Sequence, residues 1–200
     1  MKNTLLFCTG LSGSGKSYFV RNSLPDGLFY NLKSATTRPM RDGECDGREY
    51  YFRDEAFFDI TPMATRLWVN AAFWRPGMPK WLYGVPAAEV RANLGKNLVY
   101  DVIQPRYVRD MIDWFRRNEL DRFYNFRVAY FLAPENNFDV AARRASMPND
   151  MDVRMTNTCN PVDFVNAGLE IDYLMRPVNG QISNKLMRHV AALNRARRQR

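Results

Sequence analysis

The residues most able to do chemistry form one short run near the N-terminus. This run reads Gly-Leu-Ser-Gly-Ser-Gly-Lys-Ser and satisfies the pattern G-x-x-x-x-G-K-[ST] of a phosphate-binding loop. Its glycines let the backbone fold tightly, so that successive N–H groups point at phosphate oxygens. The lysine can reach the β- and γ-phosphates of a nucleotide, and the last serine can ligate Mg²⁺. The expected ATP-binding residues are Gly10, Leu11, Ser12, Gly13, Ser14, Gly15, Lys16 and Ser17.

The residues on either side of this loop predict the elements that position it. Residues 4–8, Thr-Leu-Leu-Phe-Cys, form a short apolar run that leads into the loop, as a buried parallel strand does. Residues 17–22 can begin a helix whose N-terminal dipole adds attraction for phosphate. A strand, a glycine-rich loop and a helix in this order are the setting that the motif requires.

A second set of polar side chains suited to phosphate follows the loop. Arg38 and Arg41 are three residues apart and can clamp a phosphate bidentately. The hydroxyl of Ser34, and that of Tyr50 or Tyr51, can complete such a site. Taken alone, the segment is also compatible with a turn-rich β-hairpin that carries surface arginines.

The rest of the chain alternates between predicted strands and predicted helices. Besides the first, the expected strands are residues 27–32, 97–103, 127–132 and 171–175. The expected helices are residues 86–93, 106–117, 138–146, 161–168 and 183–196. Such alternation is typical of a mostly parallel sheet covered by helices on both faces. The sequence therefore predicts an α/β fold.

Two stretches interrupt this alternation. Residues 34–85 hold many aromatics, glycines and prolines and are too apolar to be disordered, which indicates an inserted β-rich lobe. Residues 142–158 are polar, and this composition suits a small mobile lid. We therefore expect a single domain with this lobe, this lid and a core made of residues 1–33, 86–141 and 159–200.

Composition narrows the classes of function. The chain has 200 residues, and 46% are hydrophobic, which permits a sizeable core. It carries 29 Lys and Arg against 21 Asp and Glu, and this net charge of +8 suits an anionic ligand such as a nucleotide, and also nucleic acid. Its three cysteines form no C-x-x-C pair, so neither a zinc site nor a disulfide framework is expected. With no signal peptide and no run of the roughly 20 apolar residues that span a membrane, we expect a cytoplasmic protein without membrane contact.

Together these motifs resemble the guanylate kinase family. That family carries S-x-T-T-R-x-x-R-x-G-E-x-x-G-x-D-Y-x-F behind its phosphate loop, and residues 34–52 here read Ser-Ala-Thr-Thr-Arg-Pro-Met-Arg-Asp-Gly-Glu-Cys-Asp-Gly-Arg-Glu-Tyr-Tyr-Phe. Residues 81–85 look like its N-Y-Y-G-T/S, residues 99–104 resemble its L-D-I-D-x-Q-G, and residues 172–173 resemble the D-Y before its last helix. The resemblance covers nearly the whole chain, closely as far as residue 52 and loosely afterwards.

The resemblance implies a P-loop NTPase fold and a nucleoside monophosphate kinase that uses ATP and Mg²⁺. Such an enzyme transfers the γ-phosphoryl of Mg-ATP to GMP, dGMP or a related monophosphate, a reaction that needs positioning and charge neutralisation more than covalent chemistry. The expected catalytic residues are Lys16, Arg38 and the lid arginines Arg143, Arg144 and Arg154. The expected acceptor-binding residues are Ser34, Arg38, Arg41, Glu44, Tyr50, Asn70, Tyr83 and Asp101. The expected metal ligands are Ser17 and Asp101; each lid arginine could instead lie on a solvated helix face.

The positions that read the base depart from the family pattern. Guanylate kinases place a Glu a few residues before Tyr-Tyr-Gly to accept guanine N–H groups, whereas residues 67–73 contain no acid and offer Asn70 as the nearest polar replacement. The Ser or Thr after Tyr-Gly is Val85 here. A site rejects a wrong substrate when its own buried polar groups would be left unpaired, and the polar groups that read guanine are replaced here. The identity of the acceptor base therefore stays open. Glu44 is expected either to touch the base or to cap the hairpin.

Three other functions stay open at this stage. Some guanylate-kinase-like domains are non-catalytic modules that bind phosphopeptides, although the intact phosphate loop argues against that function. The net charge and the basic tail keep a polynucleotide 5′-kinase open, which salt-sensitive binding to DNA or RNA would support. A sugar-phosphate kinase of related fold would also lack a guanine-reading acid. The tyrosine-rich lobe and the predicted lid favour a small nucleotide substrate.

Overall fold

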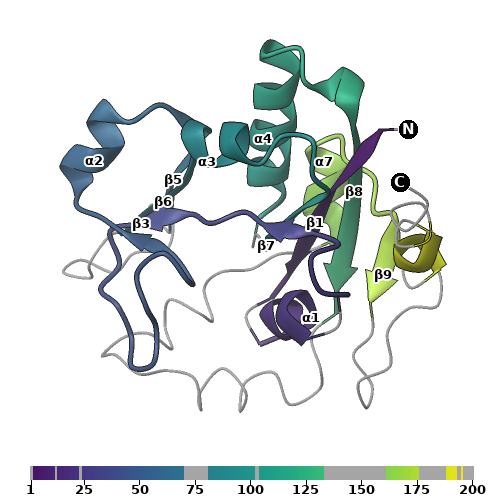
Figure 1. The fold of residues 1–200 in the computed structure, drawn as a ribbon, viewed down its shortest axis with the longest axis horizontal. Coiled ribbons are helices and arrows are strands. Elements are labelled where there is room, and N and C mark those ends of the chain that lie inside the picture. Colours follow the sequence, from purple (N-terminus) through teal and green to yellow (C-terminus); the bar gives the residue numbers. More distant parts are fainter. Residues whose placement is uncertain are drawn as a thin grey trace.

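The computed structural model describes residues 2–11, 13–22, 24–69, 81–101, 104–132, 161–175, 188–192 and 195. These residues form a larger and a smaller β-sheet, which lie side by side in Figure 1 with helices around them. Among the described residues, no helix is both long enough and apolar enough to cross a lipid bilayer.

The larger sheet is parallel throughout the described part of the chain. Its strands follow the spatial order β2-β7-β1-β8-β9, and every neighbouring pair runs in the same direction. The strand bounds are β1 (Asn3–Gly10), β2 (Tyr30–Asn31), β7 (Leu98–Asp101), β8 (Tyr124–Phe131) and β9 (Tyr173–Met175). Each of these strands overlaps a predicted one, which confirms the α/β fold with a central parallel sheet.

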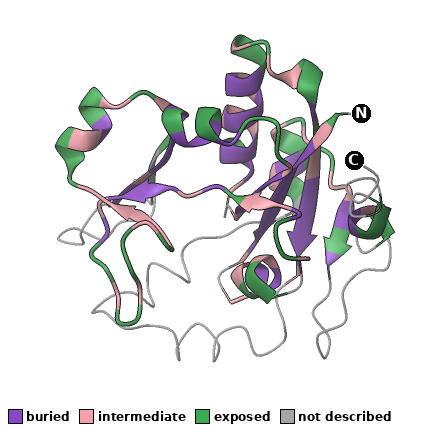
Figure 2. Ribbon diagram, viewed as in Figure 1, coloured by how far each residue is buried: buried purple, intermediate pink, exposed green. Residues whose placement is uncertain are grey.

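Strand β1 shows why this sheet needs cover on both faces. Leu5 and Phe7 pack into one hydrophobic cluster, whereas Leu6 and Cys8 pack into another on the opposite face. All four side chains are fully buried. The side chains of a strand alternate between its two faces, so an uninterrupted apolar run is what a central strand of a doubly covered sheet requires. Figure 2 shows the resulting buried centre of the molecule.

Helices supply the cover on each face. The first cluster takes residues from α4 (Pro105–Arg117) and α7 (Pro161–Asn166). The second takes residues from α1 (Lys16–Asn22) and from the helical residues 188–192. Helix α4 is the longest, and its apolar residues recur at the helical spacing that a helix packed on a sheet needs. Its buried side chains include Val108, Met111, Ile112 and Phe115.

The smaller sheet lies within the segment that was predicted to be a β-rich lobe. Its strand order is β4-β3-β6-β5. The bounds are β3 (Ala35–Thr36), β4 (Tyr51–Phe52), β5 (Met63–Val69) and β6 (Trp81–Pro86). Helix α2 (Glu55–Ile60), which the sequence analysis did not predict, starts where the Asp54 side chain accepts a hydrogen bond from Phe57 N, and it packs on the sheet through the buried Phe58.

Gly84 holds β5 and β6 at close range. A Cβ at this position would collide with the carbonyl oxygen of Thr65 on the facing strand, so only glycine fits here. The chain leaves β6 directly into α3 (Ala87–Ala92) and then enters β7, which returns it to the larger sheet. Helix α3 therefore lies at the junction of the two sheets (Figure 1).

Several predictions fall outside the described residues. These are the lid at 142–158, the helix at 138–146 and most of the helix at 183–196, of which residues 188–192 and 195 are helical. The short helix η1 (Asp121–Phe123), which joins α4 to β8, was not predicted. The division of the chain into core, lobe and lid stays a prediction.

Candidate active site

The glycine-rich loop joins the end of β1 to α1. Gly10 has a φ of 138°, and a Cβ there would collide with the carbonyl oxygen of Phe131 on β8, so a side chain is excluded where the strand turns into the loop. The amide of Ser14 donates to the carbonyl of Leu11, and the first helical bond runs from Phe19 N to Gly15 O at 2.9 Å. The sequence thus builds a tight turn that opens onto a helix N-terminus.

Lys16 lies inside this loop. Its side chain is 7% exposed, and its Nζ donates hydrogen bonds to the carbonyl oxygens of Gly10 at 2.9 Å and Leu11 at 2.8 Å. The ammonium group is therefore held over the concave side of its own loop. A positive charge in that place suits an anionic ligand.

Ser17 and Asp101 meet at the carboxyl edge of the larger sheet. The hydroxyl of Ser17 donates to Oδ2 of Asp101 at 2.5 Å, and Asp101 ends β7 in register with Cys8 on β1. Burial raises the pKa of the Cys8 thiol, the Asp101 carboxylate raises it further, and Lys16 opposes this rise. Because both charges act on the pKa of this thiol, Lys16 and Asp101 lie close to the same end of β1.

This edge is also the place where the order of the sheet reverses. The chain passes from β1 to β2 at one edge of the sheet, returns to β7 beside β1, and continues to β8 on the other side of β1. Open parallel sheets bind ligands in the crevice at such a reversal, outside the carboxyl ends of the strands. The phosphate loop and Asp101 lie at this place.

Arg38 is almost completely buried beside the smaller sheet, with 1% exposure. Its Nη2 donates to both carboxylate oxygens of Glu44 at 2.8 Å, and its Nη1 donates to the carbonyl of Pro39 at 2.7 Å. The rings of Tyr50 and Phe52 flank the guanidinium at 5.4 and 5.5 Å. A buried arginine is tolerated when its charge is paired and its donors are bound, as they are here.

Glu44 is the centre of this cluster. Besides Arg38 it accepts a hydrogen bond from the backbone amide of Arg41 at 2.8 Å, and its carboxylate lies 4.0 Å from Nη1 of Arg41. The carboxylate thus caps the turn, as one of the two sequence expectations had it. It also pairs with both arginines, a role that the sequence analysis did not assign.

Tyrosine rings lie beside the arginine cluster, and a serine hydroxyl lies nearer to β7. Tyr50 and Tyr83 pack edge to face at 5.7 Å, and burial together with the Tyr83 hydroxyl and the Asp101 carboxylate raises the pKa of Tyr50. The Ser34 hydroxyl and the Tyr100 hydroxyl share a hydrogen bond of 3.2 Å. The electrostatic influence of Asp101 on Tyr50 links the cluster around Arg38 to the carboxyl end of β7.

The structure therefore brings most of the predicted site residues into two neighbouring groups. One group consists of Gly10, Leu11, Gly13, Ser14, Gly15, Lys16, Ser17 and Asp101, and the other of Arg38, Arg41, Glu44, Tyr50 and Tyr83. Ser34 bonds Tyr100, the residue before Asp101 on β7. Ser12, Asn70, Arg143, Arg144 and Arg154 lie outside the described residues.

One predicted hydroxyl belongs elsewhere, and two polar residues were missed. The Tyr51 hydroxyl donates to Glu89 and not to the arginine cluster, because neighbouring residues of a strand point to opposite faces. Glu89 and Tyr100 received no role from the sequence. The signal for Glu89 was available: it lies beside Val90 on the buried side of a short helix, where a carboxylate needs partners.

The two groups can together neutralise several negative charges. A lysine, a helix N-terminus and two arginines converge, and Ser17 and Asp101 add the hydroxyl and carboxylate oxygens that Mg²⁺ prefers. No set of three or more His, Cys, Asp or Glu side chains gathers into a metal site in the described ranges. The arrangement is suited to holding two phosphate-bearing molecules with their phosphates facing each other.

Comparison with known proteins identifies relatives of the chain by sequence. No protein-family model matches it. It is similar to a guanylate kinase of Rhodopseudomonas palustris (strain HaA2), with 34% identity over 148 residues, which make up 70% of this chain and 59% of that protein. A guanylate kinase of Nitrobacter winogradskyi is 30% identical over 176 residues, which make up 82% of this chain and 70% of that protein. The chain spans 59% of the length of the Rhodopseudomonas relative.

Comparison of the fold agrees with the sequence relatives. The chain superposes on the crystal structure of a guanylate kinase from Anaplasma phagocytophilum with a TM-score of 0.51 and 15% identity. The match covers 100% of this chain and 88% of that one. At this level of identity the likeness concerns the fold, an α/β core with a parallel sheet.

Proposed function

The chain belongs to the guanylate kinase family, and on that premise we propose that it is an ATP-dependent nucleoside monophosphate kinase acting on GMP, dGMP or a related nucleotide. The observation that carries this proposal is the meeting of Lys16, Ser17 and Asp101 at the carboxyl edge of the larger sheet, in a chain that also holds a buried cluster around Arg38. One group is suited to a triphosphate and the other to a monophosphate. We expect the enzyme in the cytoplasm, where both nucleotides are found.

The donor side fits ATP by its chemistry. Lys16 and the amides of the loop can hold the β- and γ-phosphates, and the loop carries one further polar atom for them. The Ser14 hydroxyl is buried and has no hydrogen-bond partner within the described part of the chain, which leaves it available to a ligand. Because a side chain at position 10 would collide with Phe131, glycine is required there, and the start of the loop carries no side chain.

The donor side also fits Mg²⁺, since Ser17 and Asp101 present two oxygen atoms at one point. Magnesium usually takes one or two protein oxygens and completes its shell with water and phosphate oxygens. When bound, the ion would neutralise charge on the phosphates. Ser17 and Asp101 are the residues that would hold it, and their mutual hydrogen bond keeps the two oxygens together.

The acceptor side orients a monophosphate. Glu44 holds the guanidinium of Arg38 by accepting from Nη2 with both carboxylate oxygens, and the rings of Tyr50 and Phe52 limit its tilt. A guanidinium held in this way is preorganised, so little conformational freedom is lost when a phosphate approaches. Arg41, half-buried on the same turn, adds a second positive charge.

The reaction forms a bond between an acceptor phosphate oxygen and the γ-phosphorus of ATP, and breaks the bond from that phosphorus to the β–γ bridging oxygen. ADP leaves with the bridging oxygen. Lys16 stabilises charge on the transferring group and on the leaving group, whereas Arg38 and Arg41 reduce the repulsion between two anions. Arg143, Arg144 and Arg154 are proposed to add charge from the lid, whose closure would exclude water.

The direct test is ADP formation from Mg·ATP with a panel of ribo- and deoxynucleoside monophosphates. Turnover with GMP or dGMP at the highest kcat/KM is the expected result. The proposal would be contradicted by the absence of turnover with every monophosphate in a sample that binds ATP. A preference for another base would retain the kinase and replace guanine as its acceptor.

A further inference from the structure

A buried carboxylate joins the two sheets at a point away from the phosphates. Glu89 on α3 is 8% exposed, and its Oε1 accepts from the Tyr30 hydroxyl at 3.0 Å and from the backbone amide of Lys33 at 3.1 Å. Its Oε2 accepts from the Tyr51 hydroxyl at 2.9 Å. Three donors thus satisfy one carboxylate that has almost no contact with solvent.

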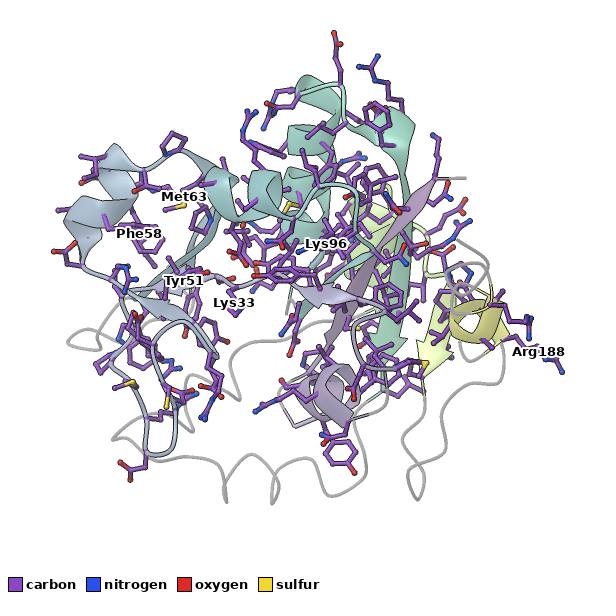
Figure 3. The ribbon with its side chains drawn as sticks, viewed as in Figure 1. Lys33, Tyr51, Phe58, Met63, Lys96 and Arg188 are labelled. Atoms are coloured by element: carbon purple, nitrogen blue, oxygen red, sulfur yellow. The ribbon has the colours of Figure 1, made fainter. Side chains whose placement is uncertain are left out.

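The three donors come from both halves of the molecule. Tyr30 lies on β2 at the edge of the larger sheet, and Lys33 follows three residues later. Tyr51 lies on β4 at the edge of the smaller sheet. Figure 3 shows the labelled Lys33 and Tyr51 near each other, between the smaller and the larger sheet. Glu89 itself lies on α3, through which the chain passes from β6 back to the larger sheet, and its carboxylate contacts Tyr30 and Tyr51 from the two sheets.

Neighbouring groups hold the larger-sheet side of this junction in place. Lys33 Nζ donates to the Tyr30 hydroxyl at 3.0 Å and lies 4.7 Å from the centre of the Tyr30 ring. Lys96 Nζ lies 5.0 Å from the same ring centre. On α3, the Asn93 side chain donates to the carbonyl of Glu89 at 2.9 Å. The carboxylate is therefore fixed from the core, and Tyr51 is the partner that lies in the smaller sheet.

The strand that Tyr51 occupies also carries the acceptor cluster. Tyr50 precedes it and packs on Arg38 and Tyr83, on the other face of the strand. The amide of Tyr51 donates to the carbonyl of Ser34 at 2.9 Å, which ties this strand to the start of β3. Any rotation of Tyr51 about the junction would move Tyr50 and Arg38 with it, relative to the phosphate loop.

We propose that Glu89 is a positioning residue that sets the distance between the acceptor-binding cluster and the phosphate loop, through the hydroxyl of Tyr51 on one side and that of Tyr30 on the other. This inference rests on the proposed kinase function of the site. A buried carboxylate is costly to desolvate, and apolar packing would stabilise the junction at least as well. Directional hydrogen bonds into two sheets instead fix an angle, which phosphoryl transfer needs because the reacting atoms must align.

Steady-state kinetics test the positioning role. The Glu89→Gln variant keeps the size of the side chain and disrupts the pattern of three accepted hydrogen bonds, and Tyr51→Phe removes only the bond to the smaller sheet. Both variants should raise the KM for the acceptor about tenfold, whereas the KM for ATP should stay within about twofold. Glu170→Gln is the matched control, because it makes the same chemical change at an exposed residue between α7 and β9. It should change neither the KM for the acceptor nor the KM for ATP.

A distance measurement tests the same inference without any turnover. Cys45 is exposed on the smaller-sheet side and accepts a spin label, and Phe123→Cys provides a second label site on η1 in the core, with Cys159→Ser in the background. The interspin distance distribution should broaden in the Glu89→Gln and Tyr51→Phe backgrounds. It should stay unchanged in Glu170→Gln.

The outcomes separate the two proposals. Equal KM values and equal distance distributions in wild type and in both variants would overturn the role of Glu89. A parallel rise of both KM values would overturn it too, since a general loss of structure acts on both substrates. If no nucleoside monophosphate is phosphorylated by the wild type but the distances broaden as expected, the proposed function fails and the junction role of Glu89 stands.

Discussion

The hydroxyl of Ser17 donates a 2.5 Å hydrogen bond to Oδ2 of Asp101, across 84 residues of sequence. One partner lies in the first turn of α1 and the other ends β7, so the contact joins the end of the phosphate loop to the strand that neighbours β1. The parallel register of Cys8 with Asp101 brings the two elements to the same height at the edge of the sheet. Two oxygen atoms that lie together in this way would supply two of the six ligands that Mg²⁺ prefers.

Asp101→Asn should weaken the response of the enzyme to Mg²⁺. The amide retains the size of the side chain and removes its negative charge, so the Mg²⁺ concentration for half-maximal ADP formation should rise about 10- to 100-fold. Titration of turnover with MgCl₂ at fixed ATP measures this shift. Asp113→Asn, which alters a partly exposed aspartate on α4, is the control and should leave the curve in place. An unchanged midpoint for Asp101→Asn would remove Asp101 from the metal site.

Lys16→Met should abolish most phosphoryl transfer and leave the fold intact. The variant keeps the aliphatic stem but loses the ammonium group, and removal of one preorganised charge-stabilising donor lowers kcat about 10²- to 10³-fold. The lost hydrogen bonds to Gly10 and Leu11 are local, so the thermal midpoint should change by only a few degrees. Lys2→Met, at an exposed lysine, should retain full turnover. Activity close to wild type in Lys16→Met would take the loop out of the mechanism.

Arg38→Ala should affect the acceptor much more than ATP. The substitution removes a guanidinium that Glu44 and two aromatic rings hold in place, so the KM for the monophosphate should rise at least about tenfold. The KM for ATP should change little because the phosphate loop is untouched. A similar rise of both constants would discredit the assignment of Arg38 to the acceptor.

The ion pair between Arg38 and Glu44 also leads to a prediction for stability. Removal of one partner of a buried ion pair leaves the other charge without compensation, at a cost of about 3 kcal/mol. Arg38→Ala and Glu44→Ala should each lower the free energy of unfolding, and the double variant should lose clearly less than the sum of the two. Urea denaturation of the three variants and the wild type gives this cycle. Strict additivity would show that the contact contributes nothing to stability.

Tyr51 should contribute to alkaline denaturation. Burial, with the hydrogen bond to Glu89, raises the pKa of Tyr51 from 10.0 to about 12 in the folded chain. The stabilisation is complete while the unfolded hydroxyl is neutral, at pH below 10.0, and it is lost as pH rises towards about 12, because the unfolded chain then releases the proton first. Thermal midpoints measured across this window should fall less steeply in Tyr51→Phe than in the wild type. The exposed Tyr18 provides the control, since Tyr18→Phe should leave the slope unchanged.

The parallel sheet could be predicted from the sequence because its strands are short and apolar. Residues 4–8 and 127–132 read as buried strands, and the structure extends the first to Asn3–Gly10 and the second to Tyr124–Phe131. The extra residues include the polar Asn3, Thr9 and Asn125, which hydrophobicity does not mark as strand, and the buried Tyr124, which Asn125 separates from the apolar run. Helix α2 was missed because its six residues are too few for a periodic pattern, although Asp54 is a typical N-terminal cap.

The candidate site was predictable where chemistry depends on local spacing. The phosphate loop and the arginine pair are short motifs, so the residue types alone indicated Lys16, Ser17 and Arg38. The partners of these side chains were harder to predict, because they depend on how separate strands meet. Glu44 pairs with Arg38 through a turn, and Glu89 gathers Tyr30 and Tyr51 from two different sheets. Such contacts follow from tertiary packing, which a single sequence does not display.

The burial of β1 on both faces determines how its backbone amides exchange with solvent. Its central residues Leu5, Leu6, Phe7 and Cys8 are shielded from solvent on both faces, and hydrogen-bonded neighbours flank the strand on both edges. Backbone amides in such a strand exchange with deuterium only when the whole domain unfolds, whereas those of short edge strands exchange through small local openings. We therefore expect β1, which leads into the phosphate loop, to be among the slowest-exchanging segments in the described part of the chain. Short edge strands such as β2 and β9 can open locally many times between global unfolding events, while β1 and the loop that follows it stay in place.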